Sequence, residues 1–498
     1  MTARDVRRGF LAGAVAGLVV VAGNYLLDLL AGLAPLPELL QQPLLAAMPG
    51  PVFGFLIDTL QHAGKVLEEL GLIVAMVATL ALLGALKAAL GRRFSIPFLG
   101  MLVALAGWLA VTLALLPVTG MGVLGLADGI TVPLLWGLLF AIYGFLLEAI
   151  GQAPAAAESA DPRRRRLLTT PLAIAGLATA FLAVRLIPGW YRAIFEAPEE
   201  AVGGPSPVIT PVDRFYIVSK NFSDPVVSGS GWRLTVHGKV ERAFSLTLDQ
   251  FRALPATTET VTLECVSNNV GGALMSTGVF SGPSLRDLVV MASPAADADA
   301  IAFQSRDGYT ETIALALVMA TPEILVAHSL DGAPLPDRHG FPARIVLPGR
   351  YGMRGPKWLE NIELARGDHG GFWEGQGWDH AAVVKTTARF DSPRDGQTVR
   401  MSQLLVAGVA FAGTRGISAV EVSADGGRSW SEAEQGDNPS PLSWTLWKLP
   451  WSPEREGAYT LVVRARDGTG ALQTAAVGPS FPNGASGYHV IHVNVRSG

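Results

Sequence analysis

Five long apolar runs in the first 195 residues constrain the fold of this chain more than any other feature. A helix needs about 20 mostly apolar residues to cross a bilayer, and no run beyond residue 198 approaches that length. Because 50% of the 498 residues are hydrophobic and only 16% are charged, the chain is too apolar to be wholly soluble. The runs predict membrane-spanning helices at residues 10–33, 66–90, 96–116, 131–150 and 172–190.

Lysine and arginine are unevenly distributed around these runs. Ten of them flank one set of helix ends, whereas the alternate connections between the runs carry only Lys65. Cytoplasmic loops retain basic residues, so the N-terminus is predicted to lie inside the cell. With five spans in the cell membrane, everything after residue 195 then lies outside, and the multi-pass region contacts lipid. The ten residues are Arg4, Arg7, Arg8, Lys87, Arg92, Arg93, Arg163, Arg164, Arg165 and Arg166.

The arginine run 163–166 has two interpretations. In the first, it is a stop-transfer charge cluster ahead of the last span. In the second, it is an internal twin-arginine export signal, because two arginines, a spacer and two hydrophobic residues lead into a weakly apolar helix. That route carries folded domains, so it would serve a domain that acquires a cofactor inside the cell.

The pattern of the sequence changes after the membrane region, 1–195. Segment 196–211 is rich in proline and has two adjacent glycines, which predicts an extended linker. Residues 212–385 mix short strand signals with a few helical segments, which predicts an α+β domain. Residues 386–498 carry strand signals separated by Gly, Asp and Pro turns, which predicts an all-β, immunoglobulin-like sandwich. The chain is therefore predicted to be multidomain, with an all-α, five-helix membrane region first.

Cys265 is the only cysteine of the chain. A single cysteine excludes an internal disulfide, a cysteine-ligated iron–sulfur cluster and a CxxC zinc site. Cys265 is either a small buried core residue or a reactive thiol. The second interpretation is favoured by its position, where a β run gives way to a polar, glycine-rich loop. The net charge of −4 leaves no general basic field and argues against nucleic-acid binding.

Segment 344–358 has the composition of an anion-binding loop. It combines three glycines with Arg344, Arg350, Arg354 and Lys357 directly after a strand. Glycine lets the backbone approach an anion closely, and arginine holds phosphate through paired hydrogen bonds. A phosphate-bearing cofactor suits this segment; a solvated charged turn is the alternative. Neither a Walker A nor a GxGxxG motif is present, so nucleotide hydrolysis and a dinucleotide-binding fold lack support.

Two motifs and the domain that follows them resemble one known family. The motifs are TLECVSN, around Cys265, and HGFPARIVLPGRYGMRGPKWL, over 339–359; SADGGRSW and GYHVIHV belong to the β region. Together they resemble the sulfite oxidase family of molybdopterin-dependent oxidoreductases, in a membrane-anchored form with a C-terminal Mo-co dimerisation domain. The resemblance implies a homodimer and a Mo-molybdopterin cofactor, with Cys265 ligating molybdenum and with His339, Arg344 and Lys357 holding the pterin phosphate. The cofactor-binding set that it implies is Asn221, Cys265, Ser267, His339, Arg344, Gly352 and Lys357.

The chain departs from the family pattern where the substrate would bind. Sulfite oxidases carry Arg-Asn-His where this chain has Lys220-Asn221-Phe222, and they carry a tyrosine where it has His328. Lysine lacks the planar fork with which arginine grips an oxyanion. His328 keeps a proton-transferring group, or is a histidine satisfied within the fold. Lys220, His328 and Arg350 are the candidate catalytic residues besides Cys265.

These observations predict an oxidoreductase that moves an oxygen atom to or from a small S- or N-oxide type substrate on the outer face of the membrane. The alternative is a non-enzymatic membrane receptor with a β-rich ectodomain. An enzyme of this kind needs a separate electron-transfer partner, a cytochrome or a quinone-linked protein. His62 is the only histidine before residue 237, so the membrane region cannot supply both ligands of a bis-histidine haem.

Overall fold

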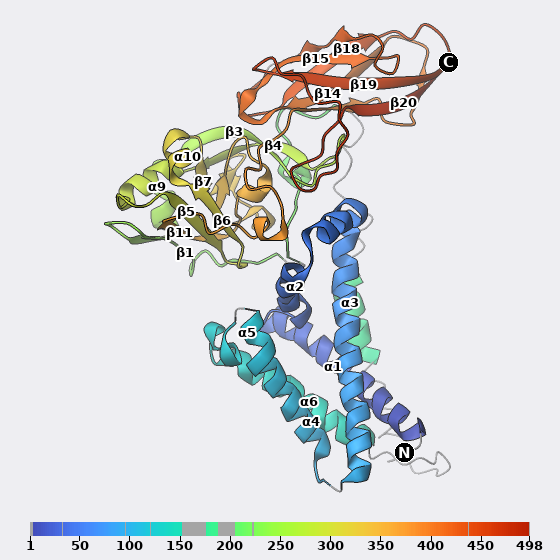
Figure 1. Cartoon of the computed structure of the whole chain (residues 1–498), viewed down its shortest axis with the longest axis vertical. Helices are drawn as coiled ribbons and strands as arrows, with labels where there is room; N and C mark the ends of the chain where they lie inside the picture. The colour runs from blue at the N-terminus through green and yellow to red at the C-terminus, as the bar shows by residue number, and fades with distance from the viewer. Residues whose placement is uncertain are drawn as a thin grey trace. The chain divides into compact units, whose positions relative to one another are not determined.

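A computed structural model of the chain divides into two compact units, Met1–Met48 with Leu60–Ala197 and Pro49–Thr59 with Pro198–Gly498 (Figure 1). The first unit is helical, and the second consists mainly of strands. The structure describes residues 3–31, 33–94, 96–119, 121–151, 176–187, 205–221, 224–436 and 438–497.

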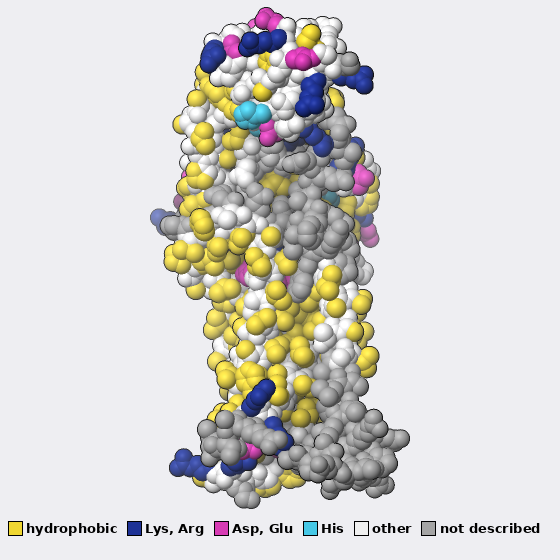
Figure 2. Space-filling view, turned by 90° about the vertical axis from the view of Figure 1, so that its right-hand side faces the viewer, with side chains coloured by type: hydrophobic (Ala, Val, Ile, Leu, Met, Phe, Trp, Pro, Cys, Tyr) yellow, Lys and Arg dark blue, Asp and Glu magenta, His cyan; other side chains and the backbone are white. Residues whose placement is uncertain are grey.

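Within the described residues, four helices are long and apolar enough to cross a membrane. On the face that Figure 2 shows, the described surface of the helical unit is mostly hydrophobic, with Lys and Arg side chains at one end. The apolar segments are Asp5–Ala31, Ala63–Arg93, Leu99–Val118 and Thr131–Ile150. They belong to α1 (Ala3–Ala31), to α3 (Gly50–Arg93), to α4 (Leu99–Ala110) with its continuation through η1 (Val111–Leu115) and α5 (Leu116–Val118), and to α6 (Thr131–Gly151).

The fifth predicted span is helical over Gly176–Ile187, a shorter apolar segment than the other four. The rest of 172–190 and the arginine run 163–166 lie outside the described residues. The count of five spans and the outward orientation that depends on it therefore stay predictions.

The connection between the first two predicted spans is helical, and this helix was not predicted from the sequence. Helix α2 covers Leu36–Ala47, and α3 begins at Gly50 rather than at residue 66. Proline lies in the first turn of α2, where its missing N–H costs nothing. Helix α3 has 44 residues, so at 1.5 Å per residue it is about 66 Å long. That is roughly twice the hydrocarbon thickness of a bilayer.

The described part of 205–385 is built on three sheets. A mixed five-stranded sheet has the order β2-β1-β11-β5-β6, in which β1 and β11 are parallel. A second sheet has the order β3-β4-β8-β9, and β7 pairs with β10 in the third. The strands are β1 (Arg233–Gly238), β2 (Phe244–Thr247), β3 (Thr257–Glu264), β4 (Met275–Gly282), β5 (Ala300–Ser305), β6 (Thr310–Ala314), β7 (Leu325–Ala327), β8 (Ser329–Leu330), β9 (Ala333–Pro334), β10 (Arg344–Val346) and β11 (Leu359–Ala365).

Short helices cover these sheets. They are α8 (Leu248–Arg252), α9 (Leu285–Ala292) and α10 (Leu315–Ala320). Thr247 starts α8 with a capping box: its hydroxyl accepts from the Gln250 amide, and the Gln250 side chain accepts from the Thr247 amide. The domain is therefore rich in strands and poor in helix, as the α+β prediction required.

Two sheets of the C-terminal region share one apolar core. Buried side chains from both sheets pack together, including Phe390, Val420, Trp447 and Leu461. The described strands form the orders β12-β14-β18-β17 and β13-β20-β19-β15-β16. This is a two-sheet packing; its immunoglobulin-like character stays a prediction. The strands are β12 (Thr387–Ser392), β13 (Thr398–Arg400), β14 (Leu404–Phe411), β15 (Ile417–Ser423), β16 (Ser431–Glu432), β17 (Glu434–Gln435), β18 (Thr445–Trp451), β19 (Gly457–Asp467) and β20 (His489–Arg496).

The described end of the predicted linker, 205–211, contacts both domains of the second unit. The Ser206 amide donates to the Asp391 carboxylate at 2.9 Å, and the Thr210 amide donates to the Thr277 carbonyl at 2.8 Å. Both side chains are buried. This piece of chain therefore connects the two domains of the unit.

Candidate functional site

Cys265 follows β3 directly and begins the loop 265–274, which leads into β4. The Cys265 amide donates to the Leu274 carbonyl at 2.9 Å, and the Asn268 amide donates to the Cys265 carbonyl at 3.0 Å. Cys265 is 9% exposed, and its Sγ lies 3.1 Å from the Ser267 hydroxyl. A hydroxyl at that distance can donate to a thiolate, the form of cysteine that binds metals.

Arg344 is a buried cation at the start of β10. It is 6% exposed, and an amino group donates to the His339 carbonyl at 3.3 Å. Within the described part of the chain its Nε–H has no hydrogen-bond partner, and burial lowers the pKa of Arg344 to about 10. The side chain is still charged at neutral pH. A buried charge needs an opposite charge or hydrogen bonds, so this geometry suits an anion.

His339 and Lys357 lie beside Arg344. A Cβ atom on Gly340 would lie 2.9 Å from the Lys357 Cβ and 3.2 Å from the Arg344 Cβ, so the three segments meet there. Burial, together with the charges of Arg344 and Lys357, lowers the pKa of His339 to about 4. The Lys357 ammonium donates to the carbonyls of Val218 at 3.2 Å and Arg338 at 3.0 Å. A neutral imidazole thus lies among cations, as expected for a site whose anionic partner is not part of the chain.

Tyr216 connects Cys265 to the cationic segment 344–358. It was not among the residues predicted from the sequence. Burial raises the pKa of its phenol well above the ordinary value, and the charges of Cys265 and Arg344 act on it in opposite directions. A Cβ atom on Gly352 would lie 2.7 Å from the Tyr216 hydroxyl, so glycine is needed for this close approach. The sequence signal was an aromatic pair, Phe215 and Tyr216, shortly after the predicted linker.

Lys220 and Asn221 are held by Asp307, a residue in the turn between β5 and β6. The Lys220 ammonium donates to the Asn221 side chain and to the Asp307 carbonyl, both at 2.8 Å, and it lies 3.6 Å from the Asp307 carboxylate. The Asn221 amide group donates to that carboxylate at 2.9 Å. The positive charge of Lys220 is therefore largely balanced. Sequence reasoning missed Asp307 because it lies far from Lys220 along the chain.

The other two candidate catalytic residues lie in different surroundings. Arg350 donates to the Ala381 carbonyl at 2.5 Å, which joins the cationic segment to the chain just before β12. The His328 ring packs edge-on against Phe251 of α8, with centroids 5.7 Å apart. Burial and the charge of Arg252 lower the pKa of His328. In the described residues no interaction of His328 reaches Cys265, Arg344 or Lys220, so its catalytic role stays a prediction.

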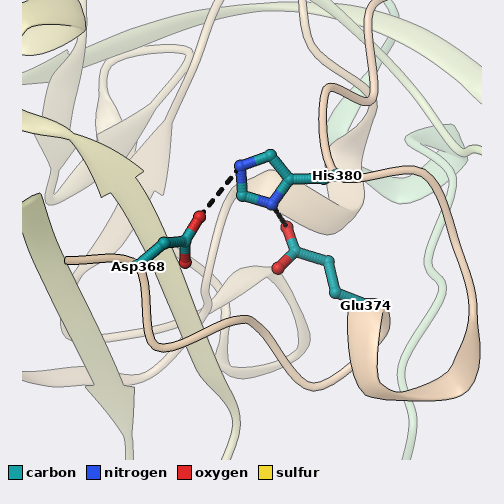
Figure 3. Close-up of side chains that lie close together, drawn as sticks. All are labelled: Asp368, Glu374 and His380. Atoms are coloured by element: carbon teal, nitrogen blue, oxygen red, sulfur yellow. Dashed lines mark ion pairs between the residues drawn. The ribbon is translucent and has the colours of Figure 1, made fainter.

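A chain of ion pairs runs from the cationic segment to the surface. Buried Arg354 pairs with Glu311 and Glu374, and burial raises the pKa of Glu311 to about 8. The two ring nitrogens of His380 lie 2.9 Å from Asp368 and 3.0 Å from Glu374 (Figure 3). Glu374 contacts both Arg354 and His380, so the cluster extends the contacts of Arg354 toward the surface.

The second unit matches two known families in chain order. The oxidoreductase molybdopterin binding domain matches residues 221–373, and the Mo-co oxidoreductase dimerisation domain matches residues 381–482. Mitochondrial sulfite oxidase of Rattus norvegicus is 29% identical over 337 residues, which cover 58% of this chain and 62% of the rat protein. The chain belongs to the sulfite oxidase family of molybdopterin-dependent oxidoreductases. The family and its Mo-molybdopterin cofactor, both predicted from the sequence, are thereby confirmed.

Two further similar proteins cover different shares of the chain. YedZ1 of Azospira oryzae, a candidate subunit of a protein-methionine-sulfoxide reductase, is 26% identical over 236 residues, which cover 44% of this chain and 87% of that protein. The sulfane dehydrogenase SoxCD from Paracoccus pantotrophus has the same fold, with a TM-score of 0.52 and 20% identity over 60% of this chain and 86% of the other. The chain spans 62% of the length of the rat sulfite oxidase.

The residues around Tyr216 fit the sulfite oxidase family's cofactor. Cys265 offers the soft thiolate that the metal needs. Arg344 offers a buried, unused donor, and His339 and Lys357 lie beside it, so these three residues would hold the phosphate of the pterin. No described acidic side chain neutralises Arg344, so the positive charge is available to an anionic group.

Proposed function

We propose that this protein is a membrane-anchored, molybdopterin-dependent oxidoreductase that moves an oxygen atom to or from a small S- or N-oxide type substrate. The observation that carries the proposal is the buried, unneutralised Arg344 in the same site as the thiol of Cys265. When bound, the cofactor supplies a metal that changes its oxidation state by two electrons and accepts or gives the oxygen atom.

The protein's own residues bind and orient the reacting groups. Cys265 provides the thiolate ligand, with Ser267 as hydrogen-bond donor at 3.1 Å. His339, Arg344 and Lys357 hold the phosphate, and Asn221 and Gly352 complete the cofactor pocket. Lys220 and Arg350 border the substrate approach, and His328 is the candidate proton-transferring group.

The ion pair between Lys220 and Asp307 favours a neutral substrate. The Lys220 ammonium lies 3.6 Å from the Asp307 carboxylate, so the pair offers little net charge to a dianion such as sulfite. A charge-balanced pair can still donate a hydrogen bond to the oxygen of a neutral S- or N-oxide. The name of the YedZ1 relative points to the same substrate class.

The four apolar helices support a membrane anchor, and the basic flanks support an outward-facing catalytic domain. The oxidoreductase needs a separate electron-transfer partner, a cytochrome or a quinone-linked protein. The dimerisation domain at 381–482 supports a homodimer.

Metal analysis and activity assays on the purified full-length protein test the proposal. We expect about one molybdenum per chain and one pterin, with turnover of S-oxides or N-oxides exceeding that of sulfite when an artificial electron donor or acceptor is present. A protein without molybdenum would favour the receptor alternative. If sulfite is the best substrate, the proposed substrate class is wrong, whereas the assignment as a molybdopterin-dependent oxidoreductase stands.

A further inference from the structure

The loop 265–274 carries Cys265, and its own hydrogen bonds close its base and one turn at its tip, where the Gly272 amide donates to the Asn269 carbonyl at 2.8 Å. The Asn268 side chain accepts from the Leu274 amide at 3.0 Å and donates to the Glu264 carboxylate at 2.9 Å. These bonds join the ends of β3 and β4. The tip of the loop, with Gly271 and Gly272, also contacts the C-terminal domain.

The side chain of Arg389, on β12 of the C-terminal domain, binds the backbone at the tip of the loop. One amino group of the guanidinium donates to the Gly272 carbonyl at 2.7 Å. The other amino group donates to the Ser206 hydroxyl at 3.1 Å, and Nε donates to the Asp391 carboxylate at 3.0 Å. Arg389 is buried. Because all three sides of the planar group are bonded, the donor that faces Gly272 has a fixed direction.

His489, on β20, packs against the same tip. Gly271 has a φ of +79°, and a Cβ atom there would collide with the imidazole of His489. The ring is held in turn, because its Nδ1 accepts from the Phe390 amide at 3.0 Å. The loop therefore rests on a ring whose position is set by the neighbouring strand β12.

We propose that Arg389 and His489 are positioning residues, through which the C-terminal domain keeps the Cys265 loop closed and aims the thiol. Neither residue touches the reacting atoms; both act through Gly271 and Gly272. The ligand role of Cys265 rests on the proposed function, whereas the closure of the loop rests on the contacts alone.

Thiol labelling tests the proposal directly, because Cys265 is the only cysteine of the chain. Full-length protein is purified in detergent from cells that make no molybdopterin, and labelling by a disulfide reagent is followed in time. We expect Arg389→Gln and His489→Ala to label about tenfold faster than the unchanged protein. Arg389→Lys, which can reach Gly272 but cannot keep all three bonds, should be intermediate.

Arg464→Gln is the matched control. Arg464 is also an ion-paired arginine of the C-terminal domain, with Nε 2.8 Å from Glu421 and its guanidinium 3.8 Å from the Trp430 ring centre. We expect its labelling rate to stay within about twofold of the unchanged protein. Equal acceleration in Arg464→Gln and Arg389→Gln would mean general loosening of the domain and would overturn the proposal.

The metal-loaded protein provides a second readout. The sulfur-to-molybdenum absorption band should shift in Arg389→Gln and stay unchanged in Arg464→Gln. If Arg389→Gln does not fold, His489→Phe, which keeps a ring but removes the acceptor for Phe390, serves in its place. Labelling of both Arg389→Gln and His489→Phe at the unchanged rate would refute the proposal, whether or not the protein contains molybdenum.

Discussion

The residues near Tyr216 combine a soft ligand with buried positive charge. Cys265 supplies the ligand, and Arg344 keeps its charge at 6% exposure without a described acidic partner. Either feature alone has an ordinary structural explanation. Together they suit a cofactor that carries both a soft metal and a phosphate, because each feature satisfies one end of such a molecule.

At the residue scale, replacing Cys265 by serine separates the metal ligand from the phosphate grip. We expect Cys265→Ser to lose at least about a thousandfold in turnover, roughly 4 kcal/mol of transition-state stabilisation, while retaining the pterin. The reason is that the phosphate contacts depend on Arg344 and Lys357. Pterin fluorescence and steady-state assays measure the two effects. Full turnover in the serine variant would remove the central assignment.

The low pKa of His339 predicts a loss of stability in acid for the cofactor-free protein. The unfolded chain takes up a proton near pH 6.5, whereas the folded protein does so only near pH 4. The unfolded state thus binds more protons between these values, and stability falls as the pH drops, by about 2 kcal/mol at pH 5. His489, whose pKa burial also lowers to about 4, adds a similar loss.

Urea unfolding at pH 7 and pH 5 measures this effect. The variant His339→Gln carries no titrating ring at this position, so it should lose the part of the acid-induced loss that belongs to His339, about 2 kcal/mol at pH 5, and keep the part that belongs to His489. An identical pH dependence in the variant and the unchanged protein would mean that His339 titrates normally in the folded state.

Sequence patterns could identify the residues whose chemistry is rare in this chain. A single cysteine before a glycine-rich loop and four cations within 344–358 stand out without any knowledge of the fold. Tyr216, Asp307 and Arg389 could not be found this way, because their roles come from contacts between distant segments. Arg389, for example, lies 117 positions from the glycine it holds.

At the element scale, four of the five apolar runs correspond to helices that are long and apolar enough to cross a membrane, because length and hydropathy suffice for that purpose. The start of α3 at Gly50 was missed, since the segment before residue 66 is too polar to be part of a span. Strands β1, β3 and β10 lie within residues 212–385, where the sequence predicted short strands. The pairing of these strands into three sheets depends on long-range register, which a single sequence does not reveal.

The arginine run 163–166 yields a prediction about export. Molybdopterin is assembled in the cytoplasm, so a catalytic domain on the outer face should cross the membrane already folded around it. We expect Arg164→Lys with Arg165→Lys to leave the domain inside, folded and loaded with metal, while the first four helices still insert. Protease accessibility on intact spheroplasts measures this outcome.

The double substitution Arg164→Lys with Arg165→Lys preserves the charge of the run. It therefore separates the two interpretations of the run without a further control variant. A stop-transfer cluster acts through charge alone, so that interpretation expects no effect. Unchanged exposure of the domain on the outer face would therefore refute export by a twin-arginine signal.

At the scale of the whole molecule, the C-terminal domain predicts assembly. Its match to a dimerisation domain leads us to expect a homodimer, as most soluble oligomers are symmetric pairs. Light scattering on detergent-solubilised protein measures the mass. A monomer across a wide concentration range would count against the dimer.

A further prediction concerns the membrane region as an electron carrier. His62 is the only histidine before residue 237, so purified protein should have no haem Soret band. An absorbance spectrum of the purified protein at known concentration measures the haem content per chain. A full Soret band in a preparation free of other subunits would show that haem is ligated in another way.

The contact between Arg389 and Gly272 also sets an order of events during synthesis. The two residues are 117 positions apart, and a ribosome adds about 5–20 residues per second. The loop that carries Cys265 is therefore made roughly 6–23 seconds before the arginine that closes it. During that interval the thiol lies on a nascent chain whose loop still lacks the hydrogen bond from Arg389 to the Gly272 carbonyl.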